Sequence, residues 1–107
     1  MSREAHLAIL NRLTNELLVA VADGDTAVPE ASRLAVWVRA DLVPWAQDRV
    51  ESFPDEAGQA ALKSDCGVLD GLDSLLTGAS GAEAAQWARQ IHRTATILLA
   101  RLEYLED

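Results

Sequence analysis

Apolar side chains recur along this chain every three to four residues, and short clusters of helix-breaking residues interrupt the recurrence. The breaks are "ADGDTAVPE" at residues 22–30, "ESFPDE" at residues 51–56 and "TGASGAE" at residues 77–83. Proline near a helix start and glycine near a helix end are usual boundary signals. The pattern therefore predicts helices over residues 2–22, 30–52, 55–77 and 81–106.

The last predicted helix has the most regular apolar face, which consists of Ala84, Ala88, Ile91, Ala95, Leu98, Leu102 and Leu105. Ser80 is followed three residues later by Glu83, a spacing that predicts a capping box at the start of this helix. The alanines would allow a neighbouring helix to approach closely.

The second predicted helix contains "AVWVRADLVPW", with a proline inside an otherwise helical pattern. Its apolar face consists of Leu34, Val38, Leu42 and Trp45. We expect a kink at Pro44, because proline has no N–H to donate to the carbonyl of Ala40.

Four helices joined by short loops predict an all-α, up-down-up-down bundle in which sequential neighbours are antiparallel. The length of 107 residues suits a single domain with one modest core. We therefore treat residues 1–107 as one helical-bundle domain.

The chain carries a net charge of −8, from seventeen acidic and nine basic residues. Such a surface repels phosphate backbones and disfavours nucleic-acid binding. No apolar run has the length of a membrane span, and the N-terminus lacks the features of a signal peptide. A single cysteine, Cys66, excludes an internal disulfide. These features predict a cytoplasmic protein without membrane contact.

Polar residues near the middle of the bundle form the first candidate site. Antiparallel helices of similar length place their midpoints at one level, so a polar layer of Asp41, Asp65 and His92 is expected between aromatic layers. The ligand-pocket candidates are Trp37, Asp41, Trp45, Asp65, Trp87 and His92. Asp65 falls on the buried arc of its helix and needs a partner, for which His92, Arg39 and Arg101 remain open. In the simpler interpretation, these residues only complete the core.

Motifs for metal or nucleophilic chemistry are missing from the sequence. Di-iron bundles need Glu-x-x-His motifs, but Arg3 and Arg89 occupy the positions three residues before His6 and His92. Cys66 is expected to act as a small hydrophobic residue, because burial and an adjacent carboxylate disfavour its thiolate. We therefore expect no metal and no cofactor, and the sequence argues against an enzyme.

A second apolar stripe on the second helix predicts an interface. Val36, Val43 and Val50 lie away from the Leu34 face, and Tyr104 adds an aromatic side chain near the C-terminus. The leading hypothesis is a non-enzymatic bundle that acts through protein contacts, with a homodimer expected. The alternative is a small-molecule-binding bundle or cofactor-free enzyme with a tryptophan-walled pocket and an Asp/His layer.

Three segments carry a resemblance to a known group of proteins: "RLAVWVRADLVPWAQDRV", "CGVLDGLDSLLTG" and "ARQIHRTATILLARLEYLED". Over residues 30–107 the chain resembles small all-helical proteins of unknown function from high-GC bacteria, which are associated with natural-product gene clusters. The resemblance implies an accessory or regulatory protein of specialised metabolism, and it assigns no catalytic residue.

Overall fold

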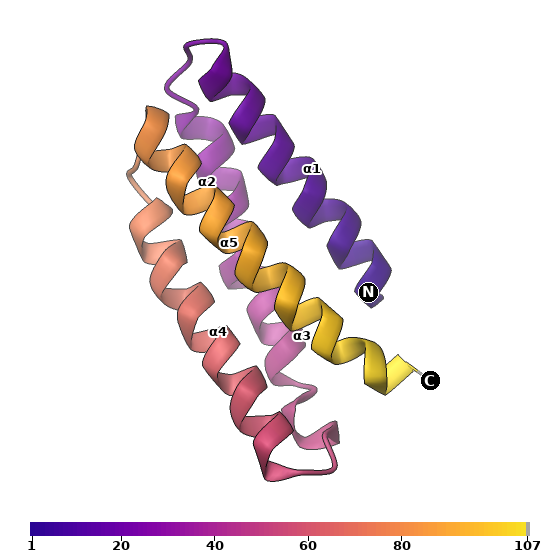
Figure 1. Cartoon of the computed structure of the whole chain (residues 1–107). Coiled ribbons are helices and arrows are strands. Elements are labelled where there is room, and N and C mark those ends of the chain that lie inside the picture. Colours follow the sequence, from indigo (N-terminus) through magenta and orange to yellow (C-terminus); the bar gives the residue numbers. More distant parts are fainter. Residues whose placement is uncertain (107) are drawn as a thin grey trace.

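Within residues 1–106, which the computed structural model describes, four helices run alternately up and down the molecule (Figure 1). The bundle consists of α1 (Arg3–Ala22), a second helix in three parts, α4 (Glu56–Leu76) and α5 (Gly81–Leu102). The three parts are α2 (Val28–Trp37), a π-helical turn (Val38–Leu42) and α3 (Val43–Gln47). Short 3-10 turns follow at Val50–Ser52 and Glu103–Glu106. The prediction of an all-α four-helix bundle is confirmed.

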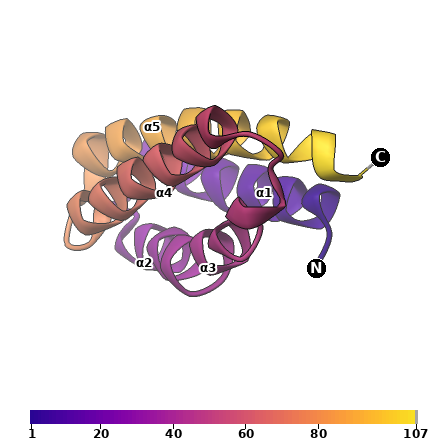
Figure 2. The same cartoon turned by 90° about the horizontal axis from the view of Figure 1, so that it is seen from below.

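The four helices surround one elongated core. α5 packs between α1 and α4, while α2 and α3 contact α1 and α4 from the other side. Figure 2, seen from below, shows α5 and the α2–α3 helix on opposite sides of the bundle. The fully buried large apolar side chains come from all four helices: Leu10, Leu17, Leu34, Leu42, Leu62, Leu69, Leu76, Ile91, Leu98, Leu99 and Leu102.

Local hydrogen bonds and glycines set most helix ends. Ser2 caps α1, since its Oγ accepts a hydrogen bond from the backbone N–H of Ala5 at 3.1 Å. Gly24 and Gly78 follow α1 and α4 with φ values of 86° and 87°, a left-handed conformation that glycine adopts at little cost. The helix boundaries therefore follow from residues close to them in the chain.

The start of α5 differs from the prediction. Ser80 precedes the helix, but its side chain makes no capping hydrogen bond, and Glu83 instead accepts from Trp87 Nε1 at 3.5 Å. The predicted capping box is wrong. The backbone N–H of Gly81 donates to the carbonyl of Thr26 at 2.7 Å, which joins the α1–α2 loop to the α4–α5 loop.

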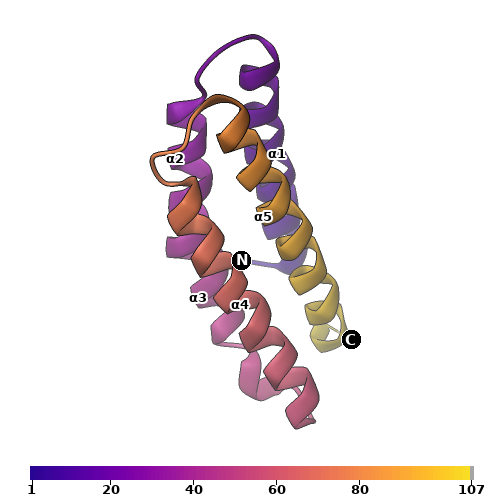
Figure 3. The same cartoon turned by 60° about the vertical axis from the view of Figure 1, so that its left-hand side comes forward.

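The distortion expected at Pro44 takes the form of the π-helical turn that ends just before it. The N–H of Val43 donates to the carbonyl of Val38, five residues back. In a regular α-helix the ring of Pro44 would clash with the carbonyl of Ala40 and leave it without a donor. The wider turn accommodates the proline while the helix continues into α3 (Figure 3).

The π-helical turn overturns the predicted valine interface. Val43 and Val50 are 3% and 6% exposed and belong to the core, whereas Val36 is 46% exposed. One extra residue in a turn rotates all following side chains by about 100° about the helix axis. This rotation carries Val43, Ala46 and Val50 into the core. The side chain of Tyr104, the fourth interface candidate, lies outside the described residues.

Gly67 and Gly71 do not make a close helix contact. Both are exposed, and a Cβ atom added at either position would have no neighbour within 4 Å. The four-residue spacing of these glycines would suit close helix packing, but no neighbouring helix uses it. None of the helices within residues 1–106 combines the length and hydrophobicity required to span a membrane.

Candidate functional site

A buried histidine lies between the first two tryptophans. The ring centroid of His6 is 5.9 Å from that of Trp37 and 4.4 Å from that of Trp45. His6 comes from the first two turns of α1 and is only 2% exposed. We call this group of three rings the His–Trp cluster.

The π-helical turn is the reason that both tryptophans face α1. In a regular helix, side chains eight residues apart point about 80° away from each other. The extra residue of the turn removes most of that difference and places Trp37 and Trp45 on the same side. As a result, Trp45 moves from the centre of the predicted apolar face to its half-buried edge, beside His6.

Arg49 closes the outer side of the cluster. Its guanidinium carbon lies 4.2 Å from the centroid of the Trp45 ring, and its Nη1 donates to the Trp45 carbonyl at 2.9 Å. A guanidinium over an indole face is attracted by the ring's electron density. Arg49 therefore fixes the orientation of Trp45, one turn after the π-helical turn.

The surroundings favour a neutral His6. Burial lowers its pKa below the ordinary value of 6.5, and the N-terminal amine and Arg49 act in the same direction. Asp41, on the π-helical turn, acts in the opposite direction but has an exposed side chain. At neutral pH the imidazole therefore carries no charge.

The polar atoms of the His–Trp cluster are buried. Both ring nitrogens of His6 and the indole nitrogens of Trp37 and Trp45 are buried without a hydrogen-bond partner among the described residues. The larger surface grooves are lined by other residues. A buried polar atom without a partner costs about 1–3 kcal/mol, so this cluster is a point of stored strain. A neutral, buried imidazole between the two indoles makes the packing of α1 against α2 and α3 sensitive to protonation.

The other predicted site residues do not join this cluster. Asp65 pairs with Arg101, whose Nε donates to Oδ2 at 2.8 Å, so Arg101 is the partner among the three left open. His92 Nε2 lies 2.8 Å from Asn11 Oδ1, across the contact between α1 and α5. The side chain of Asp65 thus meets α5 through Arg101, and that of His92 meets α1. The expected polar layer of Asp41, Asp65 and His92 is not formed.

Trp87 also lies apart from the other tryptophans. It is half-buried on α5, where its indole N–H faces Glu83, while Trp37 and Trp45 face α1. The expected three-tryptophan wall is therefore wrong. The reason is that each tryptophan follows the phase of its own helix, and the π-helical turn turns Trp45 toward α1.

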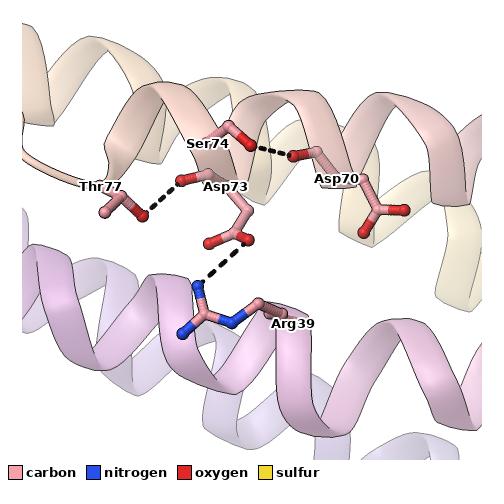
Figure 4. Close-up of polar contacts among 5 residues, drawn as sticks. All are labelled: Arg39, Asp70, Asp73, Ser74 and Thr77. Carbon is pink, nitrogen blue, oxygen red and sulfur yellow. Dashed lines mark hydrogen bonds and ion pairs between the residues drawn. The ribbon is translucent and has the colours of Figure 1, made fainter.

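The buried carboxylate of the bundle is Asp73 rather than Asp65. Asp73 is 5% exposed, and its Oδ2 lies 3.5 Å from Nη1 of Arg39 on the π-helical turn (Figure 4). Its backbone carbonyl also accepts from the hydroxyl of Thr77 at 2.9 Å, which secures the end of α4. Oδ1 of Asp73 has no partner among the described residues.

Burial raises the pKa of Asp73, and the neighbouring Asp70 adds to the increase while Arg39 opposes it. The side chain of Arg39 is 56% exposed, so water weakens its attraction for the carboxylate. The pair therefore compensates the buried charge only in part.

Cys66 behaves as the sequence suggested. It is 3% exposed, and burial, with Asp70 and Asp65, raises the pKa of its thiol to about 11. Such a thiol is a poor nucleophile at neutral pH. Within the described part of the chain, no three His, Cys, Asp or Glu side chains converge as a metal site.

Sequence reasoning overlooked His6, Arg49 and Asp73. A signal for His6 was present, because it precedes Leu10 by four residues on the apolar face of α1. A signal for Asp73 was also present, because it lies four residues after Leu69 and three before Leu76, in the buried series of α4. No family model matches the chain, and neither the curated proteins nor the solved structures contain a match.

Proposed function

We propose that this protein is a non-enzymatic helical-bundle module that acts through protein contacts, and that it self-associates through the outer side of α4 and α5. The observation that carries the proposal is an apolar strip on that side, formed by Val68, Leu72, Leu75 and Ile97. Val68, Leu75 and Ile97 are 47%, 49% and 44% exposed, and Leu72 is half-buried. We call these four residues the α4/α5 strip.

The ion pair between Asp65 and Arg101 indicates how the strip is arranged. Val68, Leu72 and Leu75 follow Asp65 at spacings of three to four residues and so lie on the same side of α4. Ile97 precedes Arg101 by one turn on α5. Since Asp65 and Arg101 are hydrogen-bonded, Ile97 adjoins the apolar row of α4 across the α4–α5 contact.

The apolar character of the strip favours a second copy of the chain as the occupant. The net charge of −8 opposes association of most surfaces, but the α4/α5 strip is apolar, and the charges at its end neutralise each other. A twofold axis across such a strip would place apolar side chains against their equivalents. Isolated exposed valines elsewhere, such as Val19, offer no comparable row.

Mass measurement combined with substitution tests this proposal. We expect the wild type to be a dimer by native mass spectrometry at micromolar concentration, and Leu75→Glu to be a monomer with unchanged helical circular dichroism. Val19→Glu on α1 is the matched control, because Val19 is as exposed as Leu75, at 49%. A wild-type monomer throughout the micromolar range, or dissociation by both substitutions alike, would overturn the proposal.

The basis for a biological role is the resemblance to small all-helical proteins associated with natural-product gene clusters. On that basis we place the module as an accessory or regulatory protein of specialised metabolism. The α4/α5 strip would then serve assembly of the module, and the role would be tested by deleting the gene and comparing secreted metabolites.

A further inference from the structure

The opposite flank of α5 differs from the apolar strip in both charge and polarity. A groove of about 630 Å³ runs between α1 and α5, a volume within the usual range for small-molecule sites. We call it the α1/α5 groove; its lining residues are Asn11, Arg12, Thr14, Asn15, Leu18, Arg89 and His92. It contains two guanidinium groups and no carboxylate, in a chain with a net charge of −8.

The arginines of this groove are less neutralised than three others in the chain. Arg33, Arg39 and Arg101 each have a carboxylate within 3.6 Å. By contrast, Arg89 has no carboxylate within ion-pair distance among the described residues, and Arg12 reaches Glu16 only at 4.0 Å. Glu16 is also shared with Arg33. Positive charge at the α1/α5 groove is therefore available for a ligand.

The remaining lining groups are suited to hold oxygen atoms. Asn11 Oδ1 is engaged by His92, which leaves the amide N–H groups of Asn11 as donors, and Asn15 adds a second amide. Thr14 is 5% exposed, lines the groove and has a hydroxyl without a partner among the described residues. Guanidinium and amide donors together are the usual partners of phosphate and carboxylate groups.

We propose that the α1/α5 groove binds the oxyanion group, phosphate or carboxylate, of a small metabolite. A small ligand is favoured over a long polyanion because the overall charge repels extended chains of phosphates, while a compact anion experiences mainly the local guanidinium groups. Arg89 is the principal charge partner, and Asn11 and Asn15 orient the oxygens. The proposal does not depend on self-association, since the groove lies on the flank of α5 away from the α4/α5 strip.

Titration of the isotope-labelled protein at low ionic strength tests the site, with inorganic phosphate and citrate as separate probes. We expect saturable shifts of the side-chain amides of Asn11 and Asn15 in proton–nitrogen spectra. Saturation by phosphate alone identifies a phosphate-bearing ligand, and saturation by citrate alone a carboxylate-bearing one. Saturation by both supports the shared oxyanion chemistry.

Arg89→Gln should weaken binding about tenfold, the loss expected for one charge-assisted hydrogen bond. Arg93→Gln is the matched control, because Arg93 is exposed one turn further along α5 and does not line the groove. Both residues are exposed, so the fold should be retained. Absence of saturable shifts with either probe, or equal weakening by the two substitutions, would overturn the proposal.

Discussion

α5 and the helix formed by α2 and α3 lie on opposite sides of the same core, but only α5 keeps one helical phase throughout. From Gly81 to Leu102, α5 is regular, and its core side chains Ala84, Ala88, Ile91, Ala95, Leu98 and Leu102 are at most 1% exposed. Across the core, the π-helical turn shifts the phase between α2 and α3. A single extra residue thus decides which side chains after Leu42 are buried.

The two helices also differ in how their polar groups are partnered. The polar groups of α5 that the sequence singled out have partners, since His92 meets Asn11 and Trp87 meets Glu83. Around the π-helical turn, the nitrogens of His6, Trp37 and Trp45 have none among the described residues. Irregular turns of this kind are often found at functional positions in proteins. The α4/α5 strip and the α1/α5 groove both adjoin the regular helix α5. The proton-sensitive His–Trp cluster lies beside the irregular helix.

The largest loss of stability is expected from a charge at Val43. Because the shifted phase buries this side chain, Val43→Asp should lower the free energy of unfolding by about 3–5 kcal/mol. Val36→Asp, on the exposed side of α2, should change it by less than about 0.5 kcal/mol. Urea denaturation measures both.

If Val43→Asp does not fold, Val43→Ala and Val36→Ala should keep the same order, with about 1–2 kcal/mol for the buried site. Equal effects at the two positions would show that the helix keeps one phase.

On α5, truncation should follow the regular pattern. Leu98→Ala removes a fully buried side chain and should cost about 2–5 kcal/mol, measured by thermal or urea unfolding. Gln90→Ala on the exposed side should stay within about 0.5 kcal/mol. A small effect at Leu98 would contradict the tight packing of this helix.

A pH series tests the His–Trp cluster. The pKa of His6 is lowered in the folded state, so the unfolded chain binds more protons and stability should fall as the pH drops below about 6.5. His6→Phe keeps a ring between the tryptophans and should remove this part of the acid sensitivity.

Urea unfolding of wild type and variant between about pH 7.5 and pH 5 measures the difference. His92→Gln serves as the control, because His92 is hydrogen-bonded at the α1–α5 surface. An unchanged acid response in His6→Phe would exclude His6 as its source.

Asp73 should have the opposite pH dependence. Its pKa is raised in the folded state, so the native protein holds the proton longer and stability declines as the pH rises above about 3.8. Asp73→Asn removes the buried charge, but it also removes a weak ion pair with Arg39. It should therefore leave stability at neutral pH unchanged or raise it by up to about 1 kcal/mol.

Asp48→Asn is the control for this series, since Asp48 is exposed after α3 and is not among the groups that shift the pKa of Asp73. If Asp73→Asn were strongly destabilising at neutral pH, the Arg39 pair would be more important than its geometry indicates.

Pro44→Ala should have the smallest effect. A regained N–H donor contributes about 0.5–1.5 kcal/mol, and loss of the proline's restriction of the unfolded chain offsets most of it. The π-helical turn should persist, because reverting to a regular helix would expose Val43, Ala46 and Val50. Unchanged tryptophan fluorescence and a stability within about 0.5 kcal/mol would agree with this expectation. A marked shift in fluorescence would show that Pro44 alone imposes the turn.

Local information in the sequence was sufficient for the number of helices and their approximate ends. The period of the apolar residues and the breaker clusters act over a few residues, and the apolar face of α5 follows directly from its spacing. The low reactivity of Cys66 also followed from its neighbours and its burial on a helix face. Of the candidate site, the sequence indicated only Trp37 and Trp45. It also gave Arg101 as one of three partners open to Asp65.

Only the tertiary structure decided the phase of α3, and with it the burial of Val43 and Val50 and the contact of Trp45 with His6. The physical reason is that a proline inside a helix predicts a distortion without specifying its form, whereas a rotation of about 100° changes which side chains face the core. The form of the distortion is decided by packing against α1 and α4. In the same way, Asp73 rather than Asp65 is the buried carboxylate because α4 contacts α2 and α5 with different sides. Sequence alone thus determined the helices, and their mutual rotation determined the sites.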